Sequence, residues 1–435
     1  MFWTKLWPIY ILPLFVFAFS AIVVLHTLRK RTVRDEEPQI PLRSHGLLSG
    51  LINTFELIFR ARKFMMKTSR HNGAFVPNKV PLLFGNIYLI RGPESLETLW
   101  KLSGHSSSTE LHGFYFGRIF GMPGKAESLY ANDDSGFASK PHPASNVHPN
   151  SRIDYITHQV LKEFLLSDAS MELAPRFLAR IQSRFAEIHI GYQWSEKEDL
   201  LGFLEMELLK ANMEISHHMY GFYRPFPKWT IRKAHAARAR ILAALKEWQM
   251  RVVKGEMTDK NVYWTATKVK KWHAKFLALN GFDDDTIASL YLGIIWVSNY
   301  NFIISIFWMV LETYRCPSLL TVVKEPLSQI SAQLIMNEPS QFALIQSIYA
   351  ETLRLRTEAY ITRRFPHRSV ELGKKWVIPR NKICLASTHP AHQDNDVWNT
   401  YDGLYPLNTF WAERFLVHHH DPLSGPLNPA YRDTL

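Results

Sequence analysis

A glutamate and an arginine three residues apart are the first residues in this sequence whose types and spacing could do chemistry. Glu351 and Arg354 stand in the segment QSIYAETLRLR. On a helix this spacing separates two side chains by about 60°, so they share a face. Such a pair is either a solvated surface pair, which contributes little to stability, or a buried ion pair. Apolar residues surround it on the helical wheel: Phe342, Ile345, Tyr349, Leu353, Leu344, Ile348 and Leu355. We therefore predict a buried structural pair.

Two cysteines, Cys316 and Cys384, are the only thiols in the printed sequence. They exclude a disulfide framework and fit a reducing compartment, where a cysteine is more often a small buried hydrophobe than a reactive thiol. Cys384 lies in KICLAS, whose alternation is typical of a strand, and Cys316 follows a long apolar segment in ETYRCPS. Neither cysteine stands in a glycine-rich loop.

Three successive histidines, His418 to His420, are the other candidate metal ligands. Consecutive side chains point in different directions on any regular backbone, so they rarely share one metal ion. We expect a solvent-exposed polar loop here and no metal site.

The elements that position these residues are predicted to be mainly helical, with a small β-sheet. The segment 283–315 is the longest helical candidate, and Asp283 to Asp285 suit its positive N-terminal end. Because it is apolar nearly all round, we expect it to be buried in the centre of a large domain. Further helices are expected at 93–103 and about 340–356, strands within 75–90, and a hairpin at 370–387. The fold class is α+β rather than a doubly wound sheet.

A run of 23 residues without a formal charge, Leu6 to Leu28, stands near the N-terminus. It is long enough for a helix to cross the roughly 30 Å hydrocarbon core, and too long for a signal peptide, with no cleavage site of the A-x-A kind. Basic residues follow it, which predicts a cytoplasmic position for the rest of the chain. We predict a single-pass membrane anchor at 1–28, a basic and proline-rich linker at 29–45, and one domain at 46–435.

The net charge of +12 does not indicate a nucleic-acid partner. Lys and Arg are spread along the whole chain, and no basic module with interleaved aromatic residues stands out. A basic surface of this kind could face anionic lipid or an acidic protein instead.

The order and spacing of five C-terminal segments resemble a cytochrome P450: ETLRLR, RRFPHR, a strand pair, HPAHQDNDVW and WAERF. The resemblance covers nearly all of the chain and implies the P450 fold. It makes Glu351 and Arg354 the pair on the K helix and Arg414 the residue that locks it, although Ala412 stands where the family usually has Pro. It also implies haem as cofactor, NADPH-cytochrome reductase as partner, a lipophilic small-molecule substrate, and the endoplasmic reticulum membrane as location.

The segment WVSNYNFIISIFW at 296–308 is similar to the oxygen-side helix of one P450 branch, that of the bile-acid and oxysterol hydroxylases and prostacyclin synthase. Asn301 matches the polar residue that faces the haem there, and Phe302 stands in place of Thr. The catalytic candidates are therefore Asn301 and Ser298, the nearest hydroxyl, which could equally be a core serine bonded to a carbonyl. Arg363 is a candidate for binding a haem propionate, with a surface role as the alternative.

The resemblance also implies a glycine-rich loop after WAERF whose cysteine thiolate holds the haem iron. Twenty residues follow Phe415 and none is Cys, so we expect a P450 fold that is incomplete at its C-terminus, without the haem-cysteine loop and the L helix. Two functions stay open. One is a membrane-bound monooxygenase that hydroxylates or oxidises a sterol, terpenoid or secondary-metabolite intermediate, with isomerase chemistry as a variant. The other is a catalytically inactive truncated paralogue or an incomplete gene model.

Overall fold

The computed structural model describes residues 40–43, 48–165, 179, 231–256, 263–330 and 341–418, with positions 74, 84 and 374 left out. It is rich in helices and has small sheets, in agreement with the predicted fold class. The predicted anchor at 1–28 and the histidines at 419 and 420 lie outside these ranges. The chain forms two compact units: residues 1–101 with 360–390, and residues 102–359 with 391–435. The domain boundaries expected from the sequence stay predictions.

No single helix in the described ranges has the length and hydrophobicity to cross a bilayer. One bent pair, Ile304–Tyr314 with Pro317–Ser328, passes on combined length and composition across a bend of 110°.

The first unit is built on a four-stranded sheet in the order β1-β2-β6-β3. Strand β2 pairs with β1 in antiparallel and with β6 in parallel orientation, and β6 pairs with β3 in antiparallel orientation. A separate two-stranded hairpin joins β4 and β5. The elements of this unit are α2 (Ser49–Phe59), α3 (Ala61–Ser69), β1 (Asn78–Leu82), β2 (Gly85–Ile90), α4 (Pro93–Lys101), β3 (Tyr360–Arg364), β4 (Val370–Leu372), β5 (Trp376–Ile378) and β6 (Ile383–Ser387), with α17 (Thr388–His392) at its boundary.

The predicted hairpin at 370–387 is correct only for its first half. Strands β4 and β5 form a hairpin, but β6 leaves it and inserts between β2 and β3. Cys384, Leu385 and Ala386 are all buried, so both faces of β6 are covered. The backbone N–H and C=O groups of a buried strand need hydrogen-bond partners along both edges, and the distant strands β2 and β3 supply them.

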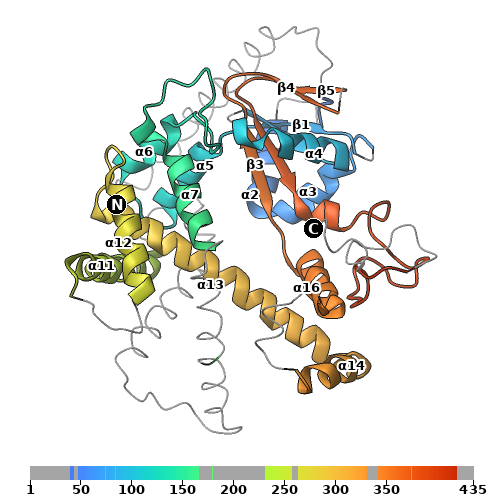
Figure 1. Cartoon of the computed structure of the whole chain (residues 1–435). Helices are drawn as coiled ribbons and strands as arrows, with labels where there is room; N and C mark the ends of the chain where they lie inside the picture. The colour runs from blue at the N-terminus through green and yellow to red at the C-terminus, as the bar shows by residue number, and fades with distance from the viewer. Residues whose placement is uncertain are drawn as a thin grey trace, which may run out of the picture. The chain divides into compact units, whose positions relative to one another are not determined.

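The second unit is almost entirely helical. Its long helix α13 begins where the Asp283 side chain accepts a hydrogen bond from the backbone N–H of Thr286 at 2.9 Å. In Figure 1, α11 and α12 lie beside the start of α13, and α16 and α14 lie near its end. The elements are α5 (Thr109–Arg118), α6 (Gly124–Asn132), α7 (Ile153–Leu165), α11 (Arg232–Lys254), α12 (Tyr263–Leu277), α13 (Asp284–Tyr314), α14 (Pro317–Ser328) and α16 (Ala343–Arg356), with short 3₁₀ turns at Ser103–His105 and Pro149–Ser151.

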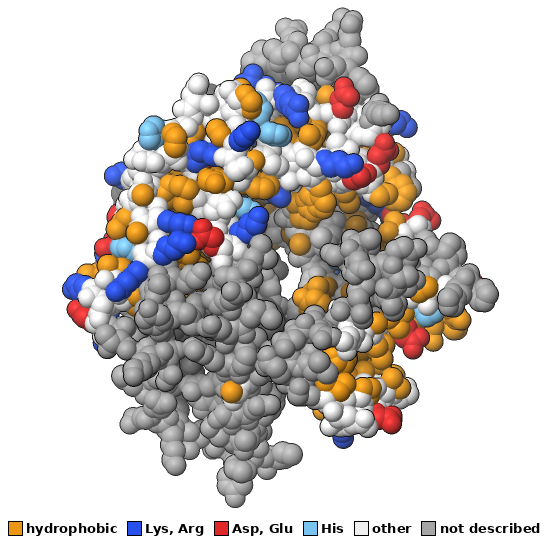
Figure 2. Space-filling model, viewed as in Figure 1, with side chains coloured by type: hydrophobic (Ala, Val, Ile, Leu, Met, Phe, Trp, Pro, Cys, Tyr) orange, Lys and Arg blue, Asp and Glu red, His pale blue; other side chains and the backbone are white. Residues whose placement is uncertain are grey.

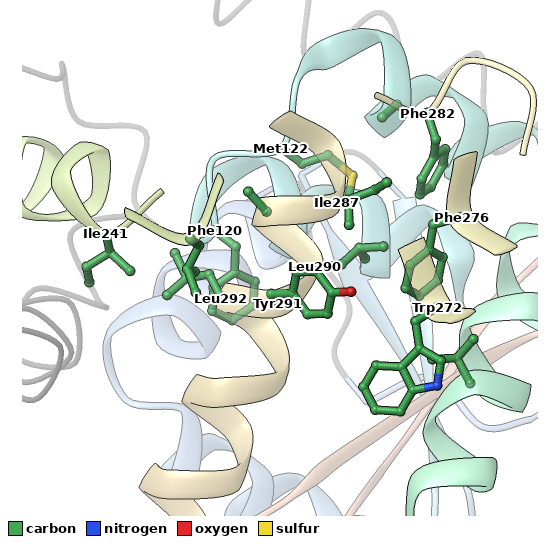
Figure 3. Close-up of a cluster of buried hydrophobic side chains, with 14 of the residues drawn as sticks. Phe120, Met122, Ile241, Trp272, Phe276, Phe282, Ile287, Leu290, Tyr291 and Leu292 are labelled. Carbon is green, nitrogen blue, oxygen red and sulfur yellow. The ribbon is translucent and has the colours of Figure 1, made fainter. Parts of the chain in front are cut away.

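The core of this unit surrounds the first half of α13. Side chains from α13 interdigitate there with aromatic residues of the helices around it (Figure 3). The labelled members are Phe120, Met122, Ile241, Trp272, Phe276, Phe282, Ile287, Leu290, Tyr291 and Leu292. Large aromatic groups dominate because each buries a large apolar area on folding.

The second half of α13 is not buried all round, which corrects the expectation for the whole segment. Ile306, Phe307, Val310 and Tyr314 are exposed, as is Val322 of α14. Figure 2 shows hydrophobic side chains gathered in the region where Figure 1 places α14 and the end of α13. The apolar composition of the segment favours burial, but it does not determine which faces of the helix other elements will cover. Lys and Arg on the viewed face are interspersed with other side chains (Figure 2).

A glycine on α13 allows α5 to approach it closely. A Cβ atom at Gly293 would lie 2.8 Å from a ring carbon of Phe116 and 3.4 Å from Phe120. The substitution Gly293→Val should therefore lower the free energy of unfolding by about 1–3 kcal/mol, measured by chemical denaturation. The control Gly124→Val at the start of α6, where a Cβ meets nothing within 4 Å, should change it by less than about 0.5 kcal/mol. Equal effects of the two substitutions would contradict this packing.

Candidate functional site

Glu351 and Arg354 lie on the buried face of α16 and form a two-pronged ion pair. The Arg354 Nε donates to Glu351 Oε2 at 2.6 Å, and Nη2 donates to Oε1 at 2.8 Å. The exposed fractions are 0% for Glu351 and 2% for Arg354. The spacing of three residues brings the planar guanidinium fork over the carboxylate, which is the geometry that makes arginine suited to such a pair.

Arg414 joins this pair from a segment 63 residues further along the chain. Its Nε donates to Glu351 Oε1 at 3.0 Å. The remaining nitrogens donate to main-chain carbonyls: Nη1 to Asn399 and Tyr405, and Nη2 to Pro406 and Thr409. These are five hydrogen bonds, and a guanidinium has five N–H groups. Every donor of Arg414 is therefore used.

The segment 391–418 is fastened to α16 at three further points. Arg354 Nη1 donates to the carbonyl of His392 at 2.8 Å. The backbone N–H of Trp411 donates to Glu351 Oε1 at 3.2 Å, and that of Phe415 donates to Ser347 Oγ at 3.2 Å. The carboxylate of Glu351 thus organises groups that are distant in sequence.

We refer to Glu351, Arg354 and Arg414 as the ion cluster. It holds two cations and one anion in a buried site. Burial lowers the pKa of Arg414, opposed by the Glu351 carboxylate. Arginine nevertheless stays charged in proteins, and the carbonyl oxygens around Arg414 compensate the excess positive charge. Because neither guanidinium group exchanges protons, the ion cluster has a structural role. It holds the segment 391–418 against α16.

An aromatic stack covers one side of the ion cluster. Tyr405 lies on Trp411 with ring centroids 4.4 Å apart and an angle of 6° between the planes. Trp411 in turn stacks on His418, with centroids 5.1 Å apart, and the Arg414 guanidinium carbon lies 5.4 Å from the Trp411 centroid. His418 is therefore partly buried against a ring, whereas the sequence predicted a solvent-exposed loop. No cluster of three or more potential metal ligands occurs among the described residues.

A second ion pair, which the sequence did not reveal, joins α13 to α16. Arg356 Nη2 donates to the buried carboxylate of Glu312, and its guanidinium carbon lies 4.1 Å from the centroid of Trp308. Arg315 lies 3.8 Å from the same carboxylate. Glu312 and Arg356 are 44 residues apart, and no periodicity relates such positions. Only the packing of the two helices brings them together.

The catalytic candidates of the sequence lie on α13. Asn301 has an exposed side chain, and its carbonyl accepts a hydrogen bond from Ser305 Oγ at 2.7 Å. The side chains of Ser298 and Phe302 lie outside the described part of the structure. An oxygen-side role for Asn301 and Ser298 stays a prediction.

Arg363 belongs to the first unit, whereas the ion cluster belongs to the second. It lies on β3, where its Nη1 donates to the carbonyl of Thr362 at 2.8 Å and its guanidinium carbon lies 5.9 Å from the Trp100 centroid. Binding of a haem propionate by Arg363 stays a prediction.

Neither cysteine fits the axial ligand of a haem-thiolate protein. Cys384 is fully buried in β6, and its thiol donates to the carbonyl of Arg363 at 3.0 Å. Burial raises the pKa of Cys384 to about 12, so the thiol is neutral, whereas the ligand must be a thiolate. Cys316 is exposed at the start of α14. A hydrogen bond with Ser318 lowers its pKa, helped by backbone N–H groups, but a surface helix end does not enclose a porphyrin.

Comparison with known proteins identifies relatives along most of the chain. The sequence is 26% identical over 421 residues to the cytochrome P450 monooxygenase fsoE of Humicola fuscoatra, covering 87% of this chain and 70% of the relative. It is 26% identical over 411 residues to efuG of Hormonema carpetanum, another cytochrome P450 monooxygenase, covering 84% and 70%. A third, calL of Penicillium decumbens, is 22% identical and covers 94% and 81%. No protein-family model matches the chain.

The substitution Glu351→Gln leaves two buried guanidinium groups without a carboxylate. We expect it to lower the free energy of unfolding by about 3–5 kcal/mol, because it removes the only anion of a buried ion cluster. Chemical denaturation followed by circular dichroism measures this loss. The matched control is Glu97→Gln, which breaks the exposed pair between Glu97 and Lys101 and should change stability by less than about 1 kcal/mol. A loss of stability at Glu351 no larger than that at Glu97 would contradict the structural role of the ion cluster.

The two thiols should react very differently with a water-soluble thiol reagent in the folded protein. At pH 8 we expect Cys316 to react faster than an unstructured thiol, because its lowered pKa raises the thiolate fraction. Cys384 should react only after unfolding, because it is fully buried and burial keeps its thiol neutral at pH 8. The substitution Ser318→Ala removes the hydrogen bond to Cys316 and should slow its labelling, while Ser328→Ala at the end of α14 serves as the control. Rapid labelling of Cys384 in the folded state would contradict its placement in β6.

Proposed function

This chain is a member of the cytochrome P450 family, and we propose that it is a membrane-bound monooxygenase that hydroxylates or oxidises a lipophilic small molecule. The substrate classes we propose are a sterol, a terpenoid or a secondary-metabolite intermediate. The observation that carries the proposal is the closed ion cluster of Glu351, Arg354 and Arg414, in a chain whose relatives are cytochrome P450 monooxygenases.

The physical character of the cluster supports a functional scaffold over a chance ion pair. Replacing a buried ion cluster with apolar side chains is often neutral or even stabilising, so stability alone is a weak reason for keeping one. A saturated cluster instead selects one arrangement of the segments it joins. Here the cluster fixes residues 391–418 against α16, which is the lock that the P450 resemblance assigns to these positions.

The proposal includes partners and a location. Electrons would come from NADPH-cytochrome reductase, and the predicted anchor at 1–28 would hold the protein at the endoplasmic reticulum membrane. A lipophilic substrate dissolves in that membrane, so attachment raises the concentration that the enzyme meets. The net charge of +12 suits an anionic membrane surface.

A second candidate function, a catalytically inactive P450 scaffold, is favoured by one specific observation. Monooxygenation in this family depends on a haem iron held by a cysteine thiolate. Cys384 is a buried neutral thiol in a strand, and Cys316 lies on a surface helix end. The described residues therefore do not fit the haem ligand.

A spectrum decides between the two candidates. The full chain is expressed with a haem precursor, reduced under carbon monoxide and compared with Cys316→Ser and Cys384→Ser variants. A monooxygenase gives the red-shifted Soret band of thiolate-ligated haem. Any such band should survive the substitution Cys384→Ser, because burial keeps this thiol neutral.

Absence of the red-shifted band from the wild-type chain would overturn the monooxygenase proposal and leave the inactive scaffold. Loss of the band in Cys384→Ser alone, with the fold retained by circular dichroism, would instead show that the neutral thiol of β6 had been assigned wrongly.

A further inference from the structure

A serine, a histidine and an aspartate of the second unit lie in a chain of polar contacts. The Oγ of Ser108 lies 3.3 Å from Nε2 of His112, and Nδ1 of the same imidazole lies 3.5 Å from Oδ1 of Asp154. Ser108 directly precedes α5, His112 lies in the first turn of α5, and Asp154 lies in the first turn of α7. A hydroxyl, an imidazole and a carboxylate in this order are the arrangement that makes a serine nucleophilic.

The hydroxyl of Ser108 is not used to cap its helix. Ser108 is the N-cap residue of α5, but its side chain makes no capping hydrogen bond. A serine at this position usually accepts a hydrogen bond from the backbone N–H of the second or third helical residue. Here the Oγ contacts the imidazole of His112 instead. The serine hydroxyl is therefore directed at a side chain that can act as a base.

The carboxylate of Asp154 meets only His112 among the side chains that the structure describes. The Asp154 side chain is 8% exposed, and within the described ranges its Oδ2 is buried without a hydrogen-bond partner. A buried carboxylate is costly unless a cation or a hydrogen-bond donor faces it. With the imidazole proton on Nδ1, facing Asp154, the lone pair of Nε2 faces the Ser108 hydroxyl. The aspartate thus favours the tautomer in which His112 can accept the serine proton.

A second aspartate fixes the starts of the two helices relative to each other. The carbonyl of Asp133 accepts a hydrogen bond from Thr109 Oγ1 at 2.9 Å, and its Oδ2 accepts from the backbone N–H of Asp154 at 3.0 Å. Its Oδ1 accepts from the backbone N–H and the hydroxyl of Ser135, at 3.0 and 2.6 Å. Asp133, Thr109 and Ser135 are all buried. In Figure 1, α5, α6 and α7 lie together, and Asp133 connects the first to the third.

The serine and the histidine are open to solvent, whereas the aspartate is not. The His112 side chain is 43% exposed and Ser108 is half-buried. The first turn of a helix presents backbone N–H groups that have no acceptor within the helix and carry partial positive charge. The carbonyl oxygen of an ester beside Ser108 would therefore meet donors at the start of α5. A position at a helix end near the surface offers little area to hold a long acyl chain, so a short ester fits best.

We propose that Ser108, His112 and Asp154 form a hydrolytic triad that cleaves small uncharged esters. His112 takes the proton of Ser108 as the Oγ bonds to the carbonyl carbon, and it gives this proton to the leaving alcohol as the ester bond breaks. Water, which loses a proton to His112, then releases the acid from the acyl-serine, and the proton returns to Ser108. Ser108 and His112 are the catalytic residues, and Asp154, which touches only the imidazole, is a positioning residue. This activity goes beyond the proposed oxidation and needs no electron donor.

The alternative is a simple helix contact between Ser108 and His112, which are four residues apart. Such pairs contribute a few tenths of a kcal/mol to a helix and have no catalytic role. The aspartate argues for more, because it comes from a different helix and is held there by the buried Asp133. The contacts at 3.3 and 3.5 Å suit a resting state, since catalytic hydrogen bonds are often long without substrate and tighten when it binds.

The first test is covalent labelling of the purified full chain with diisopropyl fluorophosphate, which transfers its phosphoryl group to an activated serine and releases fluoride. Peptide mass spectrometry locates the adduct. We expect the adduct on Ser108, and we expect His112→Gln to slow its formation about 100-fold, because the general base is removed. The matched control residue is Ser128, an exposed serine of α6 whose hydroxyl donates to the carbonyl of Lys125. We expect no adduct on Ser128.

Three outcomes of the labelling would overturn the proposal. One is the absence of an adduct on Ser108. Another is equal labelling of Ser108 and Ser128, which would show that the reagent is unselective. The third is an unchanged labelling rate in His112→Gln, which would show that the imidazole does not activate the hydroxyl. Circular dichroism of each variant verifies that the fold is retained, and both substituted side chains are at least partly exposed.

The second test is hydrolysis of p-nitrophenyl acetate, whose acyl group is short. We expect Ser108→Ala to lower the rate as far as Ser108→Ala combined with His112→Gln, because residues that act as a unit are not additive. Ser128→Ala should leave the rate unchanged. A rate in Ser108→Ala equal to that of the wild-type chain would show that other groups hydrolyse the ester, and it would overturn the proposal.

The role of Asp154 is tested by Asp154→Asn in the labelling experiment. We expect the rate of labelling at Ser108 to fall by at least about tenfold, because the imidazole loses its preferred tautomer, while the final labelled fraction stays that of the wild-type chain. A purely structural role would lower the labelled fraction instead, and that outcome would overturn the positioning role. The carbon monoxide spectrum reports the proposed oxidation chemistry separately.

Discussion

The buried carboxylate of Glu351 is the constraint on which much of the second unit depends. A single carboxylate, fully removed from water, accepts hydrogen bonds from Arg354, Arg414 and the backbone of Trp411. Desolvating such a charge is costly, and the cost is met only when its partners are in place together. The segment 391–418 has no helix or strand beyond the last residues of α17. Its path is set by the main-chain carbonyl groups that accept hydrogen bonds from Arg414.

A second ion pair connects α16, which carries Glu351, to α13. Arg356, two residues beyond Arg354 on α16, pairs with Glu312 near the end of α13. The second half of α13 is exposed along much of its apolar surface, so few core contacts hold it there. The Glu312 pair and the Trp308 ring over Arg356 therefore matter more for this part of the helix than for its buried start. Arg354 and Arg356, only two residues apart, therefore pair with two different carboxylates, those of Glu351 and Glu312.

In the first unit, helix α2 turns polar side chains toward the sheet. Helix α2 bonds to the β1–β2 turn through Asn53 and Thr54 and leaves its large apolar side chains outside. In the same unit, the thiol of Cys384 is sealed between neighbouring strands. Both features follow from position in the sheet. The edge turn offers carbonyl and N–H groups that a polar helix face can satisfy, whereas in the central strand the thiol of Cys384 donates to the carbonyl of Arg363.

The sequence by itself determined the fold class, the start of the long helix at Asp283, and the Glu351–Arg354 spacing that puts both groups on one face, because these depend on local periodicity and on neighbours within a turn. Its motif order also pointed to Arg414. The tertiary structure alone decided that β6 leaves the predicted hairpin and that the second half of α13 leaves much of its apolar surface exposed. It also decided that His418 stacks on Trp411 and that Glu312 meets Arg356. These depend on contacts between residues far apart along the chain, and local sequence patterns carry no information about which distant surface will cover which face.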